Sequence, residues 1–542
     1  MGRACIVLIR FLLVLLTRSA RVAWIGTKAT LRFIRHCCRR RAATFGSARF
    51  AHTTELVRWR VVGGEGLILA RTLGRFVRFN NPEGSAVVFA PQGAGKGVGP
   101  VISNLLDYKG SIVVTDPKGE NLAVTGRFRA KLGQVHTINL LDPEWSDQLN
   151  PLDMIRIGTP HEVVDAEALA ELMLDKDPHE ESHWRERAKS WLTGLLLFVL
   201  HAHIDQPELQ TLAQVHRLAT GDRKMLEGTL DVMTAMPQGR IRESAQQIIR
   251  ALDTEEAMNI LSNLVKGTEA WSLSKPLGVL SGRSSFDPRS FYNHTQTLYL
   301  VVPEERLAVY GPALRVIVGM MLHGIVEAGK RQAPPRHRPL FLLDEAAALG
   351  YLEPLENGMG YLRAYARALL IFQDLDQLQR TYHKWRSLLA NCGAHVFWSV
   401  NDMETAKLVA ERIGHATVRT RSSGMSQGHD AVIQHQAQSG QGEAGRLLVD
   451  ASEVMRLSPD EVLVFMNQQI AAPIRARRVM YFKERCFKGR WDRWRSGVGE
   501  FWPARADKRV RDAEASGGTR NWLSGLTPVV EPVRIQSAPV SC

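Results

Sequence analysis

The chain has 542 residues, of which 45% are hydrophobic and 23% are charged, and its formal net charge is +14. This length exceeds what one hydrophobic core usually supports, so we expect at least two folded units. The composition excludes a collagen-like chain, a disordered chain and a disulfide scaffold, and the positive charge favours a polyanionic partner such as DNA or anionic lipid. Six scattered cysteines without a CxxC pair do not favour a zinc site and fit a reducing cytoplasm.

The first 45 residues are basic and weakly hydrophobic. Two apolar stretches, 4–16 and 22–34, are interrupted by arginine or lysine. Neither reaches the roughly 20 uninterrupted apolar residues that a spanning helix needs. We expect residues 1–45 to be a membrane-proximal segment, either a basic helix at the surface of anionic lipid or an amphipathic core helix.

Short apolar runs alternate with helical patterns from residue 85 onward, which is typical of an α/β protein with a parallel sheet covered by helices. Residues 85–90 and 111–115 are predicted strands, and the helical stretch 97–106 lies between them. The glycine-rich turn after the first of these strands is the first candidate site.

The pattern changes between residues 161 and 290, where helical periodicity dominates and β-branched runs are few. This region is predicted to be an inserted all-α domain. Strand-like runs resume at 297–302, 340–343, 368–372 and 395–398, so one sheet brackets the helical insert. Residues 421–445 are rich in Ser, Gly and Gln, and we expect a surface loop there.

The glycine-rich turn has the context of a Walker A phosphate-binding loop, because it follows a predicted strand and opens a predicted helix. Its glycines would let the backbone curl around a β-phosphate, and its lysine would contact the β- and γ-phosphates. Ala90 replaces the usual first glycine, and Gly97 replaces the Ser or Thr whose hydroxyl normally binds magnesium. The alternative is a turn that serves packing alone. The predicted nucleotide-binding residues are Ala90, Pro91, Gln92, Gly93, Ala94, Gly95, Lys96, Gly97 and Val98.

A later apolar run, residues 340–343, is followed directly by two acids, Asp344 and Glu345. In ATP hydrolysis Asp344 would hold magnesium with its water shell, and Glu345 would polarise the attacking water. An apolar run before two acids is common by chance. Its pairing with an upstream Walker A loop, across a plausible insert, makes the pattern more specific.

A third strand is followed by Gln373, whose amide could sense the γ-phosphate or orient water. Ring ATPases also need a cation from the neighbouring subunit. Arg363 and Arg367 precede this strand and are the candidates, with an ordinary surface arginine as the alternative reading of each. The predicted catalytic set is Lys96, Glu345, Gln373 and Arg367, with Asp344 as the metal ligand.

Residues 488–542 are predicted to form a basic, disordered tail. Four aromatic residues are interleaved with arginines in its first part, a pattern that also suits stacking on the bases of single-stranded DNA. They are Trp491, Trp494, Phe501 and Trp502.

Taken together in order, these motifs resemble the TraG family of type IV coupling proteins over residues 46–487. Beyond the Walker A loop and the paired acids, several short stretches carry the resemblance. They are residues 46–51 (GSARFA), 104–106 (NLL), 116–121 (DPKGEN), 150–152 (NPL), 348–350 (ALG), 373–375 (QDL), 446–448 (RLL), 457–461 (LSPDE) and 473–476 (PIRA). The N-terminus departs from the family pattern, since relatives usually carry two clear transmembrane helices before the first of these stretches.

The resemblance implies a RecA-like P-loop nucleotide-binding domain in two parts, residues 46–160 and 291–487, around the all-α insert. It implies ATP and Mg²⁺ as cofactors, and a magnesium site that relies on Asp344, phosphate oxygens and waters. It also implies a homohexamer at the cytoplasmic face of the bacterial inner membrane. The implied partners are a relaxase and other relaxosome components, single-stranded DNA, and inner-membrane components of the secretion channel.

The leading hypothesis is therefore an ATP-driven motor, stimulated by nucleic acid, that delivers a relaxase–DNA substrate to a type IV secretion channel. One alternative is a substrate-docking receptor that binds ATP with little hydrolysis, which the missing hydroxyl at Gly97 favours. A double-stranded DNA pump is a further alternative, although we find no C-terminal winged-helix pattern.

Overall fold

The structure is a computed structural model, and it describes residues 44–175, 183–425, 437–466 and 469–494. The chain divides into two compact units. Unit 1 comprises Met1–Arg49 and Ala410–Val449, and unit 2 comprises Phe50–Val409 and Asp450–Cys542. Almost all of the predicted N-terminal segment 1–45 lies outside the described residues.

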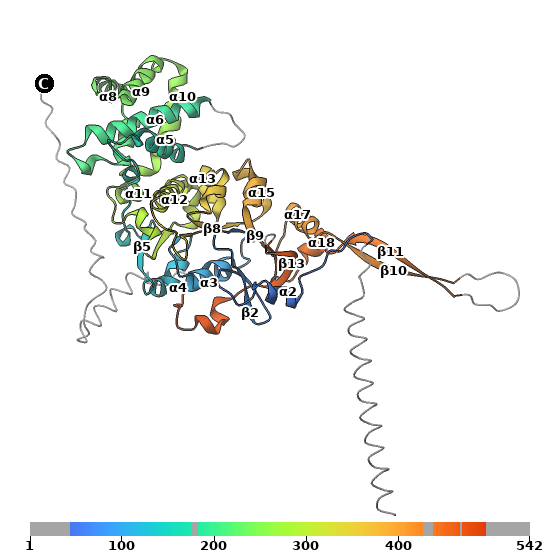
Figure 1. The fold of residues 1–542 in the computed structure, drawn as a ribbon. Coiled ribbons are helices and arrows are strands. Elements are labelled where there is room, and N and C mark those ends of the chain that lie inside the picture. Colours follow the sequence, from blue (N-terminus) through green and yellow to red (C-terminus); the bar gives the residue numbers. More distant parts are fainter. Residues whose placement is uncertain (1–43, 176–182, 426–436, 467–468, 495–542) are drawn as a thin grey trace, which may run out of the picture. The chain divides into compact units, whose positions relative to one another are not determined.

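Unit 2 is built on an eleven-stranded sheet with the order β2-β1-β13-β12-β9-β3-β8-β7-β4-β6-β5 (Figure 1). The strands are β1 (Leu67–Thr72), β2 (Arg75–Phe79), β3 (Ser85–Phe89), β4 (Ile112–Asp116), β5 (Gln134–Asn139), β6 (Gln296–Val301), β7 (Leu340–Leu343), β8 (Arg367–Phe372), β9 (Cys392–Trp398), β12 (Glu461–Met466) and β13 (Ile470–Arg477). Neighbours from β9 to β5 pair in parallel, and the pairs from β9 to β2 are antiparallel. Each strand that we predicted corresponds to one of the parallel strands.

The inner parallel strands are largely apolar runs because helices cover both faces of such a sheet. Every residue of β3, β4, β7, β8 and β9 is buried. The helices and turns around the sheet are α2 (Thr53–Arg58), η1 (Gly97–Val101), α3 (Ile102–Asp107), α4 (Glu120–Arg129), α12 (Leu307–Gly329), α13 (Glu353–Glu356), α14 (Met359–Leu362), α15 (Leu375–Thr381), α16 (Trp385–Asn391), α17 (Met403–Ile413) and α18 (Ala451–Met455).

Helix α12 is long and apolar, and it is a central element of the core. Among the described residues, the segment Glu304–Gly329 that contains it is the one helix with the length and hydropathy to cross a membrane. However, 78% of its most apolar window is buried inside the protein. Its apolar character is therefore accounted for by packing within unit 2.

All seven helices α5 to α11 lie in the chain between β5 and β6. Of these, α5, α6, α8, α9 and α10 form the helical region at the top of Figure 1, and α11 lies lower in the view. They are α5 (Glu162–Met173), α6 (His183–Ala202), α7 (Leu212–Ala219), α8 (Arg223–Ala235), α9 (Gly239–Ala251), α10 (Glu255–Thr268) and α11 (Pro276–Leu280). A buried arginine of α12 joins them to the sheet layer: Arg315 donates to the Leu172 carbonyl at 2.8 Å and pairs with Asp175 at 2.9 Å. The exact boundaries of the all-α insert, residues 161 and 290, remain a prediction.

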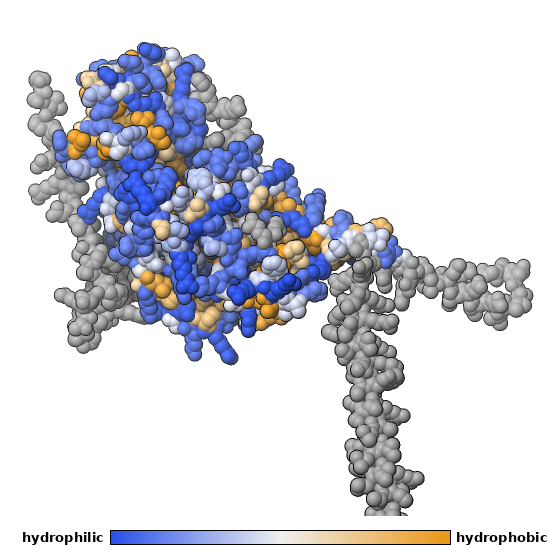
Figure 2. Space-filling model, in the orientation of Figure 1, coloured by the Kyte–Doolittle hydropathy of each residue, from blue (hydrophilic) through white to orange (hydrophobic). Residues whose placement is uncertain are grey.

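Hydrophilic residues cover most of the surface of unit 2 that Figure 2 shows, and apolar patches interrupt them. Exposed apolar side chains of the helical region include Val164, Ile249, Met258 and Leu273. Scattered exposed apolar residues are normal for a folded protein.

Unit 1 contains a long antiparallel hairpin of β10 (His415–Met425) and β11 (Ala437–Leu447). The surface loop that we predicted over 421–445 was therefore wrong for the residues that belong to these strands. Ser, Gly and Gln give little strand signal in sequence, but backbone pairing needs no particular side chain. The hairpin is joined by the start of the described chain, where the Phe45 amide donates to the Thr417 hydroxyl at 3.0 Å.

The last described residues, 488–494, are packed against unit 2. Arg127 of α4 pairs with Asp492 at 3.0 Å, and the Trp491 ring meets the edge of Tyr481 at 5.4 Å between centroids. The predicted start of the tail at residue 488 was therefore too early. Trp491 and Trp494 pack on a small apolar cluster, which leaves their rings less available to stack on DNA bases. Phe501 and Trp502 lie outside the described residues.

Candidate nucleotide-binding site

Four neighbouring parallel strands, β3, β8, β7 and β4, end at the same edge of the sheet. The predicted Walker A loop follows β3, Gln373 follows β8, and the paired acids follow β7. Ligands of open α/β sheets bind outside the carboxyl ends of the strands. The topology therefore gathers motifs that are far apart in the sequence.

The first residue of the loop after β3 is hydrogen-bonded to the neighbouring strand β8: the Ala90 amide donates to the Phe372 carbonyl at 2.9 Å. Gly93 and Gly95 have φ of 79° and 86°, a left-handed conformation that glycine adopts without penalty. The π-helical turn η1 starts at Gly97 and continues into α3. This is the backbone course of a phosphate cradle.

The lysine of the loop reaches the two acids across the site. The Lys96 ammonium donates to the Glu345 carboxylate and lies 3.8 Å from Asp344 Oδ1. The Gln373 amide donates to the other oxygen of Glu345, which Gln377 also approaches at 3.4 Å. The structure thus brings Lys96, Asp344, Glu345 and Gln373 into one cluster.

Asp344 meets the requirements of a magnesium ligand. Its Oδ1 is buried and has no hydrogen-bond partner among the described residues. Burial raises the pKa of Asp344 to about 6, against the lowering effect of Lys96. The described residues contain no group of three or more His, Cys, Asp or Glu able to hold a metal by themselves. Mg²⁺ needs oxygen ligands and commonly takes one or two carboxylates with phosphates and water, so this site fits it once a nucleotide supplies phosphate oxygens.

Glu345 sits in a strained backbone conformation. Its φ of 60° is left-handed, which is uncommon for a residue with a side chain and costs about 1–3 kcal/mol. The turn η8 (Ala346–Leu349) follows directly, and the Ala348 amide donates to the Glu345 carbonyl at 2.9 Å. This turn and the contacts to Lys96 and Gln373 hold the carboxylate toward the loop.

The remaining loop residues have other surroundings. The Gln92 amide donates to Glu304 at 3.0 Å, and Pro91 accepts from the Ala94 amide at 3.2 Å. Val98 packs on the small apolar cluster that also receives Trp491. Val98 therefore contributes packing beneath the loop and no polar side-chain group toward a phosphate.

The prediction that Arg367 acts on a neighbouring subunit is wrong on geometric grounds. Arg367 is the first residue of β8 and is not exposed to another subunit. Its side chain is buried, and its guanidinium donates to the carbonyl oxygens of Gly84 and Phe79 at 3.0 and 3.4 Å. Arg363 is exposed, so it remains a candidate for the arginine that acts on a neighbouring subunit.

Two further polar residues near the site were not predicted from the sequence to have a role there. Arg478, just after β13, donates to the Ala94 carbonyl at 3.1 Å and pairs with Asp460 at 2.6 Å. It therefore fastens the phosphate loop to the antiparallel side of the sheet. Asp460 belongs to the LSPDE stretch of the family resemblance, which was the available signal.

The second is Asp116, the buried last residue of β4. It accepts hydrogen bonds from the amides of Asn121 and Leu122 at 3.2 and 2.9 Å, which fixes the start of α4. Burial raises the pKa of Asp116 to about 7. The sequence signal for Asp116 was the DPKGEN stretch of the family resemblance.

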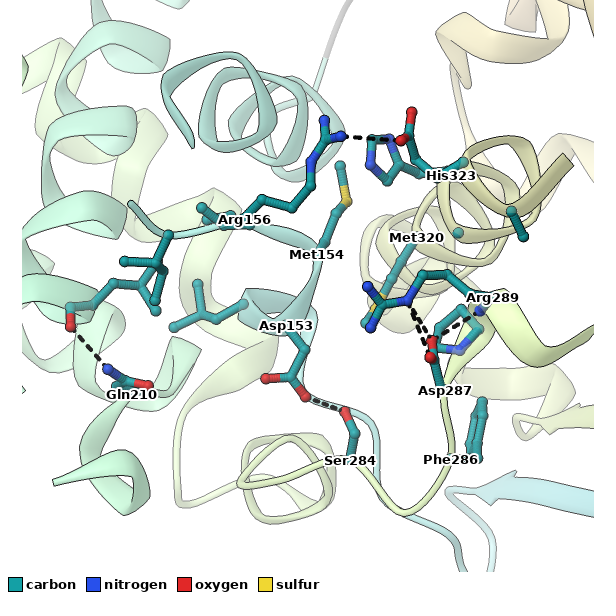
Figure 3. A pocket seen from close by; sticks show the side chains of 18 of the residues that line it. Asp153, Met154, Arg156, Gln210, Ser284, Phe286, Asp287, Arg289, Met320 and His323 are labelled. Carbon is teal, nitrogen blue, oxygen red and sulfur yellow. Dashed lines mark hydrogen bonds and ion pairs between the residues drawn. The ribbon is translucent and has the colours of Figure 1, made fainter. Parts of the chain in front are cut away.

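A cavity of about 590 Å³ lies elsewhere in unit 2, between the turn η3 (Pro151–Met154), α12 and the turn η6 (Pro288–Tyr292) (Figure 3). Two of its acids are engaged within the lining: Asp153 accepts from Ser284, and Asp287 pairs with Arg289 at 3.0 Å. None of its lining residues belongs to the loop 90–98 or to the paired acids. The cavity is thus separate from the candidate nucleotide site.

Comparison with known families gives a match over most of the chain. The family model described as Type IV secretory system Conjugative DNA transfer matches residues 42–507. Conjugal transfer protein TraG of Escherichia coli is 29% identical over 402 residues, which cover 70% of this chain and 63% of that protein. Protein VirD4 of Rhizobium radiobacter is 27% identical over 436 residues, which cover 78% and 60%. The match thus spans less than two thirds of these relatives.

Solved structures of the plasmid coupling protein TrwB share the fold. Its complex with the ATP analogue ADPNP has a TM-score of 0.58 at 16% identity and covers 84% of this chain and 99% of that one. The unbound form of TrwBdeltaN70 has the same TM-score and identity, with 84% and 95% covered. The predicted fold class is confirmed: α/β, with a RecA-like P-loop nucleotide-binding domain and an inserted all-α domain.

Proposed function

Because this chain belongs to the type IV secretory system conjugative DNA transfer family, we propose that it is the coupling protein of a conjugative or type IV secretion system. In this proposal it is an ATPase that recruits a relaxase bound to single-stranded DNA and delivers the substrate to the secretion channel. The observation that carries the proposal is the cluster of Lys96, Asp344, Glu345 and Gln373 at the carboxyl ends of adjacent strands.

ATP and Mg²⁺ are the proposed cofactors. TrwB, which shares the fold, has been solved with ADPNP and with ADP and Mg²⁺. Here the loop 90–97 would hold the phosphates, and Asp344 would hold the metal. When bound, Mg²⁺ neutralises charge on the phosphate oxygens.

The contacts of Glu345 suggest how hydrolysis is switched on. In the structure the Lys96 ammonium donates to the Glu345 carboxylate. A γ-phosphate competes for that ammonium and so releases the carboxylate. Glu345 then accepts a hydrogen bond from the attacking water, and the Gln373 amide orients both groups.

The partners follow from the family and from the charge. We propose a homohexamer in which Arg363 acts on the neighbouring subunit's nucleotide, with nucleic acid stimulating hydrolysis. The net charge of +14 suits single-stranded DNA. The proposed location is the cytoplasmic face of the bacterial inner membrane, in contact with inner-membrane components of the channel and with relaxosome proteins.

The test is ATP hydrolysis by the full chain, measured with and without single-stranded DNA. The proposal expects DNA to raise the rate, and expects Lys96→Ala and Glu345→Gln to abolish it. Lys131→Ala, which removes an exposed lysine of the same unit, is the matched control and should keep the wild-type rate. Full activity in either site variant would overturn the motor assignment.

One observation favours a second candidate, an ATP-binding docking receptor that scarcely hydrolyses ATP. Gly97 lacks the hydroxyl that normally binds magnesium in this loop. A transfer assay separates the two functions. Delivery of relaxase by Glu345→Gln at the wild-type level would support the receptor, and loss of delivery supports the motor.

A further inference from the structure

The absent hydroxyl at position 97 has a neighbour able to replace it. A Cβ atom added to Gly97 would lie 4.0 Å from Oε2 of Glu120, the first residue of α4. A side chain at position 97 would therefore begin within van der Waals range of that carboxylate. Glycine leaves this space open to Glu120.

Two features of the backbone hold the start of α4, and with it Glu120. Gly119 precedes it with φ of 68°, a left-handed conformation that suits glycine. The Asp116 carboxylate accepts hydrogen bonds from the backbone amides of Asn121 and Leu122, the two residues after Glu120. These bonds anchor the first turn of the helix beside the phosphate loop.

The Glu120 carboxylate is partly buried and lacks a strong partner. In the described part of the chain it makes no hydrogen bond and no ion pair, and burial raises its pKa. The nearest cation acting on it is Lys118, which is paired with Glu304 at 3.3 Å. Burial raises the pKa of Asp116, and Glu120 and Asp344 raise it further, so both of these acids lie near the end of β4.

We propose that Glu120 supplies a carboxylate oxygen to the magnesium shell, in place of the hydroxyl that Gly97 lacks. Asp344 and Glu120 would then be the two carboxylates of a site completed by nucleotide phosphates and water, a common arrangement for Mg²⁺. The inference rests on the proposed nucleotide-dependent function. It also explains how this loop manages without Ser or Thr.

The experiment measures Mn²⁺ binding to the full chain with ADP by electron paramagnetic resonance, which needs no catalysis. Glu120→Gln should raise the Mn²⁺ dissociation constant about tenfold or more, with ADP affinity in EDTA unchanged. Gly97→Ser in the Glu120→Gln background should recover most of the loss, because it restores the hydroxyl. Glu305→Gln, at an exposed glutamate, is the matched control and should bind Mn²⁺ like the wild type.

An unchanged Mn²⁺ constant in Glu120→Gln would overturn the inference. If that variant does not fold, Glu120→Asp decides instead, since it keeps the charge and shortens the side chain. It should weaken Mn²⁺ binding, and wild-type binding would overturn the inference. Failure of the proposed function has a different signature, namely a wild-type chain that binds Mn²⁺ and ADP but shows no DNA-stimulated hydrolysis.

Discussion

At the residue scale, Glu345 is held by the same lysine that a γ-phosphate would need. Glu345→Gln removes the charge that engages Lys96 and also removes the proposed base. We expect hydrolysis to fall by about 100-fold or more, while ATP binds as tightly as to the wild type or a few-fold more tightly. Equilibrium binding of a fluorescent ATP analogue, beside the hydrolysis rate, checks both parts. Weaker binding in this variant would contradict the competition between phosphate and carboxylate.

Asp116 gives a second prediction at this scale. Burial raises its folded pKa from the ordinary 3.8 to about 7, so the folded protein holds this proton more tightly than the unfolded chain. Between these two values stability is lost as pH rises, because the folded state must ionise a buried group. Without nucleotide and metal, the midpoint of thermal unfolding of wild type should fall relative to that of Asp116→Asn by several degrees from pH 5 to pH 8. Parallel profiles for the two proteins would contradict the raised pKa.

At the element scale, Arg478 joins the end of β13 to the phosphate loop. Arg478→Ala removes the hydrogen bond to the Ala94 carbonyl and leaves Asp460 without this partner. A lost charged hydrogen bond is worth about 1.5–3 kcal/mol, so we expect ADP affinity to fall about tenfold or more. Isothermal titration with ADP measures it. Arg477→Ala, at the exposed neighbouring arginine, should leave the affinity unchanged, and equal effects of the two variants would argue against the fastening role.

The segment after η10 (Arg485–Phe487) supports a different element, α4. Trp491 packs on Tyr481, and Asp492 pairs with Arg127. Trp491→Ala should lower the unfolding midpoint by several degrees, because it opens a gap in the small apolar cluster, and should leave single-stranded DNA affinity unchanged. A large loss of DNA affinity with unaltered stability would restore the stacking hypothesis.

At the scale of the whole molecule, the proposed hexamer requires a cation from each neighbour. Lys96→Ala and Arg363→Ala should each abolish hydrolysis, while an equal mixture should recover activity. Random mixing leaves about a quarter of the interfaces with both residues intact. ATPase assays of co-assembled variants test this. No recovery in the mixture would place the arginine in its own subunit's site or remove it from catalysis.

The sequence alone predicted six of the seven parallel strands, the glycine-rich loop after β3 and the paired acids, and it missed the mostly polar strand β5. Each is a local pattern: a buried apolar run, followed by glycines or carboxylates at its carboxyl end. Because parallel strands align these ends at one edge, the meeting of Lys96 with Glu345 also followed from the pattern. The family resemblance rested on the same short stretches.

The roles of residues whose neighbours are distant in the chain became visible in the three-dimensional fold. Arg367 looked available because it lies near Gln373 in sequence, but the extended strand carries it to the opposite edge and buries it. The β10–β11 hairpin forms through backbone pairing, and its Ser- and Gly-rich sequence has no pattern that predicts strands. Arg478 and Glu120 reach the loop through sheet order and helix placement, and long-range contacts of this kind leave no periodicity in the sequence.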